Sequence, residues 1–170
     1  QFDVIVTTNL AGDVISDLAS GLVGGLGFAS SGNFGDDVAI FEAVHGSAPK
    51  YAGKNVINPT ALILSSVMML RHLGEPDAAQ AVQDAVFVTL EEGKAVTLDV
   101  ARQVGNVEAS ASTSGFADTV IDNLGRKPAV QYETKAQPPA APPAPMPRRE
   151  PRPVDPPDTQ WLGVDIYPEL

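Results

Sequence analysis

Cysteine is missing from the 170-residue chain, which excludes disulfides, cysteine-ligated zinc and thiol catalysis. Positive charge is scarce as well, since 11 Lys and Arg against 21 Asp and Glu give a net charge of −10. That balance argues against nucleic-acid binding, because such proteins usually present a positive surface to the phosphates. No apolar run reaches the roughly 18 residues that a membrane span requires. We therefore expect no nucleic acid and no membrane among the partners, and a cytoplasmic location.

The hydrophobic pattern alternates between strand-like and helical spacing, which predicts an α/β fold. Residues 2–6 form a β-branched run typical of a buried strand, and a chain that starts on such a strand is expected to be cut from within a larger domain. Residues 12–22 carry apolar side chains at helical spacing and lead into a glycine cluster at 24–27, which predicts tight turns. A second strand is predicted over 38–44, followed by a polar loop over 45–57.

Three further helices are predicted from their end signals. Asn58 as N-cap and Pro59 at the first helical position predict a helix over 60–73. Its apolar side chains point in nearly all directions, so we expect it to be covered by its own fold and by a partner surface, as in a dimer. Another helix is predicted over 77–92, and the last begins at a Ser114 cap.

Proline dominates the segment after the last predicted helix. Ten of the twenty residues from 138 to 157 are proline, which neither a helix interior nor a central strand accommodates. We therefore predict a globular part over 1–128, a semi-rigid proline-rich linker over 129–158, and the first strand of a possible small extra domain over 159–170.

Two carboxylates, Asp13 and Asp17, stand four residues apart near the start of the first predicted helix, which puts both on one face. They can reach a common hard cation, and carboxylate oxygens suit Mg²⁺ or Mn²⁺. Acidic residues in a first helical turn are also common simply because they interact favourably with the helix dipole. The pair alone therefore leaves both interpretations open.

The 45–57 loop combines an imidazole, a hydroxyl, an ammonium group and a phenol with a glycine that lets a ligand approach the backbone. Such a loop can wrap a nucleotide, with His45 and Lys50 directed at a phosphate. Taken alone, a loop histidine is more often a structural hydrogen-bonding group, and a loop lysine is more often simply solvated. The 24–27 glycine cluster follows a helix, so it is not a dinucleotide fingerprint.

Residues 9–27 closely resemble the signature of the β-decarboxylating dehydrogenases, the family of isocitrate and isopropylmalate dehydrogenases. The similarity continues through the 45–57 loop and the helix after Asn58, with its Met68-Met69-Leu70-Arg71 run, and covers about three quarters of the chain. The resemblance implies the isopropylmalate/isocitrate dehydrogenase-like fold, a mixed sheet flanked by helices. It also implies a homodimer.

The resemblance assigns roles residue by residue. Asp13 and Asp17 match the family's Mg²⁺ or Mn²⁺ ligands, which act together with an aspartate of the second subunit. Glu42 belongs to the loop motif, and Leu98 departs from the pattern because it stands where the fullest phosphate sites have a tyrosine. Asn58 is expected near the adenine. The positions that match the family's NADP-binding residues are His45, Gly46, Ser47, Ala48, Lys50, Tyr51, Asn58 and Arg102.

Lys50-Tyr51 resembles the NADP-dependent isocitrate dehydrogenases, whereas NAD-dependent relatives tend to have an aspartate in place of Lys50. The implied reaction is the NADP-dependent oxidative decarboxylation of isocitrate to 2-oxoglutarate and CO₂. The family's acid, base and substrate-binding residues lie outside this chain, so we expect no catalytic residue here and no activity from the chain alone. Two alternatives are an NAD-dependent 3-isopropylmalate or homoisocitrate dehydrogenase, which Lys50-Tyr51 argues against, and a noncatalytic regulatory or dimerisation subunit, which intact Asp13 and Asp17 argue against.

Overall fold

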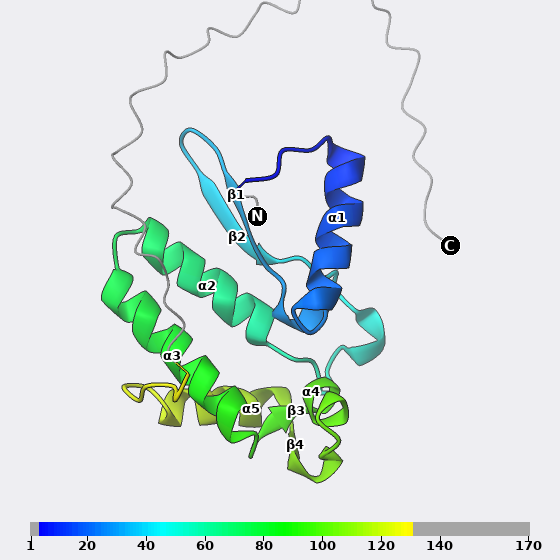
Figure 1. Ribbon diagram of the computed structural model, residues 1–170, viewed down its shortest axis with the longest axis vertical. Coiled ribbons are helices and arrows are strands. Elements are labelled where there is room, and N and C mark those ends of the chain that lie inside the picture. Colours follow the sequence, from blue (N-terminus) through cyan, green and yellow to red (C-terminus); the bar gives the residue numbers. More distant parts are fainter. Residues whose placement is uncertain (1–3, 131–170) are drawn as a thin grey trace, which may run out of the picture. The chain divides into compact units, whose positions relative to one another are not determined.

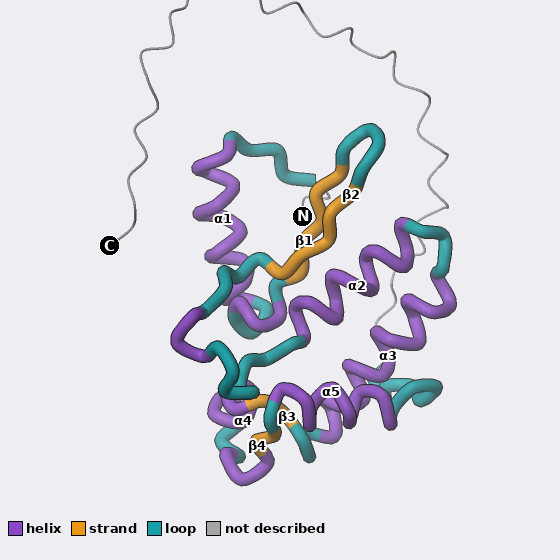
Figure 2. Tube along the Cα trace, turned by 180° about the vertical axis from the view of Figure 1, so that it is seen from behind, coloured by secondary structure: helices purple, strands orange, loops and turns teal. Residues whose placement is uncertain are grey.

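The computed structural model describes residues 4–130, and within them helices alternate with two short sheets (Figures 1 and 2). The α/β class is therefore confirmed, with its strands in two separate pairs. The helices are α1 Asn9–Leu22, α2 Thr60–His72, α3 Pro76–Glu92, α4 Leu98–Gln103 and α5 Thr113–Asp122, with 3₁₀ turns η1 Leu26–Phe28, η2 Pro49–Tyr51 and η3 Val107–Ala109. Strands β1 Ser30–Phe34 and β2 Ala39–Ala43 pair antiparallel, and β3 Val96–Thr97 and β4 Ser110–Ala111 pair in parallel.

Helix α2 lies between α3 and the β1–β2 hairpin, which cover different sides of it (Figure 1). Ser65, fully buried on α2, donates to the carbonyl oxygen of Glu42 at 2.7 Å and accepts from the amide of Ser31 at 3.3 Å, so one hydroxyl joins both strands to the helix. Part of the apolar surface predicted on α2 is thus covered by the chain itself. Leu62 and Leu73 remain 56% and 64% exposed.

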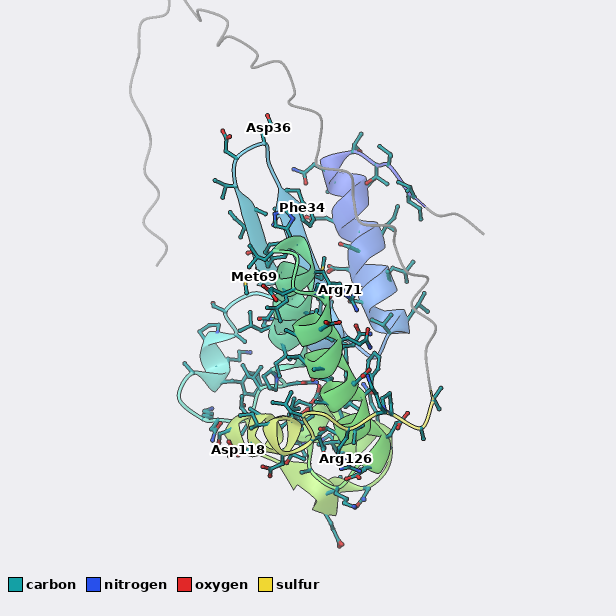
Figure 3. The ribbon with its side chains drawn as sticks, turned by 90° about the vertical axis from the view of Figure 1, so that its left-hand side faces the viewer. Phe34, Asp36, Met69, Arg71, Asp118 and Arg126 are labelled. Atoms are coloured by element: carbon teal, nitrogen blue, oxygen red, sulfur yellow. The ribbon has the colours of Figure 1, made fainter. Side chains whose placement is uncertain are left out.

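Aromatic rings attach the hairpin to the carboxyl end of α2. Phe34 and Phe41 meet edge to face with ring centroids 5.5 Å apart, an arrangement that aromatic quadrupoles favour. The ring of His72 lies 5.5 Å from Phe34 and 5.6 Å from Phe41. Figure 3 shows Phe34 near Met69 and Arg71 of α2, with Asp36 beyond it at the hairpin tip. The hairpin is therefore positioned by both side-chain and backbone contacts.

The core lies at the other end of α2, between α3, α4 and α5. One cluster contains Ala85, Val86, Phe116 and Val120, and a second contains Val96, Val100 and Ala101. Leu90 packs against both clusters, and Phe28 of η1 packs against the second. Complete burial of a side chain such as Phe116 contributes about 1.5–3 kcal/mol. Through Phe28, this core holds the turn that follows α1.

Three local predictions are wrong. Residues 4–6 of the predicted first strand have no strand pairing, since no described strand lies beside them to bond their backbone groups; residues 1–3 lie outside the described part. Helix α2 begins at Thr60, so Pro59 precedes its first residue. Helix α5 is capped by Ser112, whose hydroxyl accepts from the Gly115 amide at 3.1 Å, and not by Ser114. The predicted linker from 131 onward and the strand within 159–170 lie outside the described residues.

Acidic side chains of α3 hold the segment that follows α5. Glu91 accepts the backbone amides of Ala129 and Val130 at 2.8 and 3.0 Å. Lys127 pairs with Asp84 at 2.6 Å, and Arg126 pairs with Glu92 at 2.5 Å. The hydrogen bond from Arg126 lowers the pKa of Glu92 below its ordinary value near 4.5. Among the described helices, none combines the length and the apolar character that crossing a membrane demands.

The lowered pKa of Glu92 predicts an acid-dependent contribution to stability. This contribution is fully present when the pH is above the ordinary pKa of a glutamate. It is lost as the pH falls through the lowered pKa that Glu92 has in the folded protein. Replacing Glu92 by Gln should therefore lower the free energy of unfolding at neutral pH but not at an acid pH below the lowered pKa, where the wild type has lost the same contribution. Urea denaturation at both pH values measures this, with Glu108→Gln as an exposed control. An equal difference at both pH values would contradict it.

Candidate functional site

Asp13 and Asp17 lie one turn apart on the exposed surface of α1, and no described side chain forms an ion pair or hydrogen bond with either carboxylate. Because α1 begins at Asn9, Asp13 is its fifth residue, and the first turn contains no acidic residue. The helix dipole acts mainly within the first turn, so it does not account for this pair. Two unpaired carboxylates one turn apart remain available to a cation.

The segment that precedes α1 lies close to the helix at Gly12. The backbone of Thr8 is extended, and its carbonyl oxygen accepts the Gly12 amide at 2.8 Å. A Cβ on Gly12 would lie 2.7 Å from the Thr7 hydroxyl, which is closer than real Cβ contacts. Glycine immediately before Asp13 therefore lets the preceding segment pass close to the second turn of the helix.

The donor chemistry of this pair fits a hard divalent cation, since Mg²⁺ and Mn²⁺ commonly bind one or two carboxylates together with other oxygens. Within residues 4–130, no group of three or more histidine, aspartate and glutamate side chains could hold a metal ion. Asp13 and Asp17 would thus supply two ligands, with no third histidine or carboxylate beside them among the described residues.

The 45–57 loop exposes the two side chains on which the coenzyme prediction depends. Ala48 adopts the left-handed backbone conformation, with φ of 46°, and its carbonyl oxygen accepts the Tyr51 amide at 2.9 Å, which closes the η2 turn. Lys50 and Tyr51 both lie on η2 and are exposed, Tyr51 by 51%. The Lys54 ammonium lies 5.9 Å from the centre of the Tyr51 ring. Nδ1 of His45 lies 2.9 Å from the Gly46 carbonyl oxygen.

The carboxyl end of the loop is attached to the start of α5. Asn55, in the left-handed conformation, donates from its side chain to the Ser114 hydroxyl at 2.8 Å and accepts from the Ser114 amide at 3.0 Å. The Thr113 hydroxyl donates to the Ile57 carbonyl oxygen at 2.6 Å. The Thr113 amide donates to the Asn55 carbonyl oxygen at 3.0 Å. Four hydrogen bonds therefore fix the end of the loop.

Asn58 follows directly and is buried, with 4% exposed. Its side-chain oxygen accepts from the amide and the hydroxyl of Thr60, at 3.0 and 2.6 Å. Asn58 therefore accepts from the first residue of α2, but the N-cap position belongs to Pro59 and not, as predicted, to Asn58. Its side-chain nitrogen donates to Asp99 on α4 at 3.0 Å. No motif in the chain signals Asp99, so it could not be predicted from the sequence.

The structure thus brings together only part of the predicted set. Arg102 lies in the last turn of α4, exposed, and the Asn58–Asp99 bond connects that helix to the loop. Glu42 forms a hydrogen bond with Asn33 across the hairpin at 2.9 Å. Asp13 and Asp17 lie on α1, apart from the loop. Metal and coenzyme candidates therefore occupy separate elements.

A family profile for isocitrate/isopropylmalate dehydrogenase matches residues 1–120, most of the chain. The chain belongs to this family. It is 51% identical over 171 aligned residues to isocitrate dehydrogenase [NADP] of Thermus thermophilus, covering 99% of this chain and 33% of that protein. It is 52% identical over 123 residues to the mitochondrial isocitrate dehydrogenase [NAD] subunit alpha of Sus scrofa, covering 72% and 33%.

Solved structures agree with the family assignment. Isocitrate dehydrogenase from Methylococcus capsulatus superposes with a TM-score of 0.66 at 49% identity, over 72% of this chain and 34% of that one. The chain spans about one third of the length of the curated relatives that it matches. The predicted family and fold are therefore confirmed, and relatives with either coenzyme in their names match at similar identity.

Removing either carboxylate of the α1 pair should weaken metal binding far more than folding. In the complete enzyme, Asp13→Asn or Asp17→Asn removes one charged ligand from a divalent cation, so the Mn²⁺ dissociation constant should rise about tenfold or more and turnover should fall. Isothermal titration with Mn²⁺ and a melting curve measure the two effects. Asp118→Asn, an exposed aspartate on α5 (Figure 3), is the control. Unchanged Mn²⁺ affinity in either pair variant would show that the pair does not bind the metal.

Proposed function

We propose that this chain is the metal- and coenzyme-binding part of an NADP-dependent isocitrate dehydrogenase, which oxidises isocitrate and releases 2-oxoglutarate and CO₂. One observation carries the coenzyme choice: Lys50 and Tyr51 are adjacent and exposed on η2, in a loop whose end is fixed by α5. A cation and a phenol presented together suit a phosphate. The Thermus relative named for NADP supports the same choice.

Electrostatics separates the two coenzymes. The 2′-phosphate of NADP carries nearly two negative charges, whereas NAD has a free hydroxyl at that position. A charge-assisted hydrogen bond from Lys50 contributes about 1.5–3 kcal/mol, which corresponds to roughly 10- to 150-fold in affinity. Tyr51, His45 and Arg102 can add further donors, while Leu98 offers none. An aspartate in place of Lys50 would instead repel the phosphate.

Asp13 and Asp17 would hold Mg²⁺ or Mn²⁺. When bound, such an ion polarises the substrate oxygens at which negative charge develops. The proposed holoenzyme is a homodimer in which an aspartate of the second subunit completes the ligand set. Substrate-binding and acid–base residues would come from outside this chain, so Lys50 and Tyr51 bind coenzyme and do not transfer protons.

Specific residues argue against each of two alternative functions. An NAD-dependent dehydrogenase is the stronger rival, because a relative named for NAD is 52% identical over 72% of the chain. The basic Lys50 argues against it. A noncatalytic regulatory subunit has no need of two unpaired carboxylates, so Asp13 and Asp17 argue against that role.

The proposed function predicts a coenzyme preference. The complete wild-type enzyme should prefer NADP over NAD by about 100-fold or more in kcat/KM, and Lys50→Asp with Tyr51→Ile should abolish or reverse the preference. Steady-state rates with both coenzymes measure it. Lys54→Asp is the matched control, since it makes the same charge change next to the Tyr51 ring and should alter the preference much less. A wild-type preference for NAD would contradict the proposed coenzyme.

The second prediction concerns the 170-residue chain alone. It should show no isocitrate-dependent reduction of NADP, because the proposed acid, base and third metal ligand are supplied from elsewhere. The assay is NADPH absorbance with isocitrate and Mn²⁺, and a complete relative serves as the positive control. Turnover by the isolated chain would show that its own residues complete the site.

A further inference from the structure

Asn58 occupies the point where the 45–57 loop becomes α2, and its side chain is buried. Two of its hydrogen bonds are local, because they come from the amide and the hydroxyl of Thr60, two residues further along the chain. They satisfy the side-chain oxygen but leave its nitrogen to find another acceptor. A buried amide nitrogen without an acceptor is costly, so the identity of that acceptor matters.

The acceptor is Asp99, whose carboxylate oxygen lies 3.0 Å from the Asn58 nitrogen. Asp99 lies in the first turn of α4, 41 residues along the chain, so this bond connects two separate elements. Asp99 therefore fixes Asn58 from the α4 side.

Gly27 of η1 meets Asn58 from another direction. A Cβ at Gly27 would lie 3.0 Å from the side-chain nitrogen of Asn58 and 3.1 Å from its Cβ. The backbone of Gly27 is not in the left-handed region, so the missing side chain serves this contact and not an unusual conformation. Asn58 is thus confined between η1, α2 and α4.

Helix α4 also carries Arg102, three residues after Asp99, and residues at this spacing lie on neighbouring positions of one helix face. The Asp99–Asn58 bond thereby connects the helix that carries Arg102 to the end of the loop that bears Lys50 and Tyr51. We infer that Asp99 is a positioning residue of the coenzyme site, which holds Asn58 and sets the spacing between the loop and α4. This inference rests on the proposed function of the loop.

The test separates the hydrogen bond from the charge. Asp99→Asn removes the charge but keeps an oxygen acceptor for Asn58, whereas Asp99→Ala removes both. Gly27→Ala displaces the same Asn58 side chain from the η1 side. Gly21→Ala, on α1 with nothing near its added Cβ, and Asp118→Ala are the matched controls. All variants are made in the complete enzyme.

Three quantities are measured: the NADPH dissociation constant by fluorescence, the Mn²⁺ dissociation constant by calorimetry, and the side-chain amide signals of Asn58 by NMR without coenzyme. Asp99→Ala and Gly27→Ala should each weaken NADPH binding about tenfold, while Asp99→Asn and both controls stay within about threefold of the wild type. Mn²⁺ affinity should not change. The Asn58 amide signals should shift and lose exchange protection in the same two variants.

Several results would overturn the inference. Equal losses of NADPH affinity in Asp99→Ala and Asp99→Asn would mean that the charge of Asp99 acts and its bond to Asn58 does not. Parallel losses of NADPH binding, Mn²⁺ binding and melting temperature would indicate a purely structural role. Unchanged Asn58 amide signals in Asp99→Ala would show that the bond is absent. A wild-type enzyme that binds no NADPH would instead contradict the proposed function, and the NMR signals would still decide whether Asp99 holds Asn58.

Discussion

The constraint on which the candidate site depends is that the chain must leave an exposed loop and enter a buried helix within a few residues, with its polar groups satisfied. From Asn55 to Thr60 this is achieved by hydrogen bonds to α5, to α4 and within the segment itself. Helix α4 extends the arrangement further, because Gln103 donates to the Gly24 carbonyl oxygen at 2.9 Å in the turn after α1. The element that bears the proposed metal ligands and the coenzyme loop are thus both connected to α4.

Much of the fold could be predicted because its signals are local. Helices α1, α2, α3 and α5 and strand β2 follow from apolar spacing and from glycine or proline at their ends. The first predicted strand was wrong, because pairing depends on a neighbouring strand that its own residues do not specify. Strands β1, β3 and β4 were missed for other reasons: β1 is rich in serine and glycine, and the other two have only two residues each.

The residues of the candidate site could likewise be predicted only where their sequence signals are local. Asp13, Asp17, Lys50 and Tyr51 are recognisable in the sequence because each belongs to a short motif, and the structure leaves all four exposed. The structure changes the interpretation of the first pair by placing it beyond the first turn of α1. Asp99 could not be predicted, since its partner stands 41 residues away and a single aspartate in a short helix has no signature. Positioning contacts of this kind come from tertiary packing.

The most direct test of the proposed site is a crystal structure of the complete enzyme with NADP and Mn²⁺. The 2′-phosphate should lie within hydrogen-bond distance of the Lys50 ammonium and the Tyr51 hydroxyl, with the Asn58 side chain still bonded to Asp99 and the Mn²⁺ ion on Asp13 and Asp17. A phosphate bound away from η2, or an Asn58 side chain that leaves Asp99 when the coenzyme binds, would contradict it.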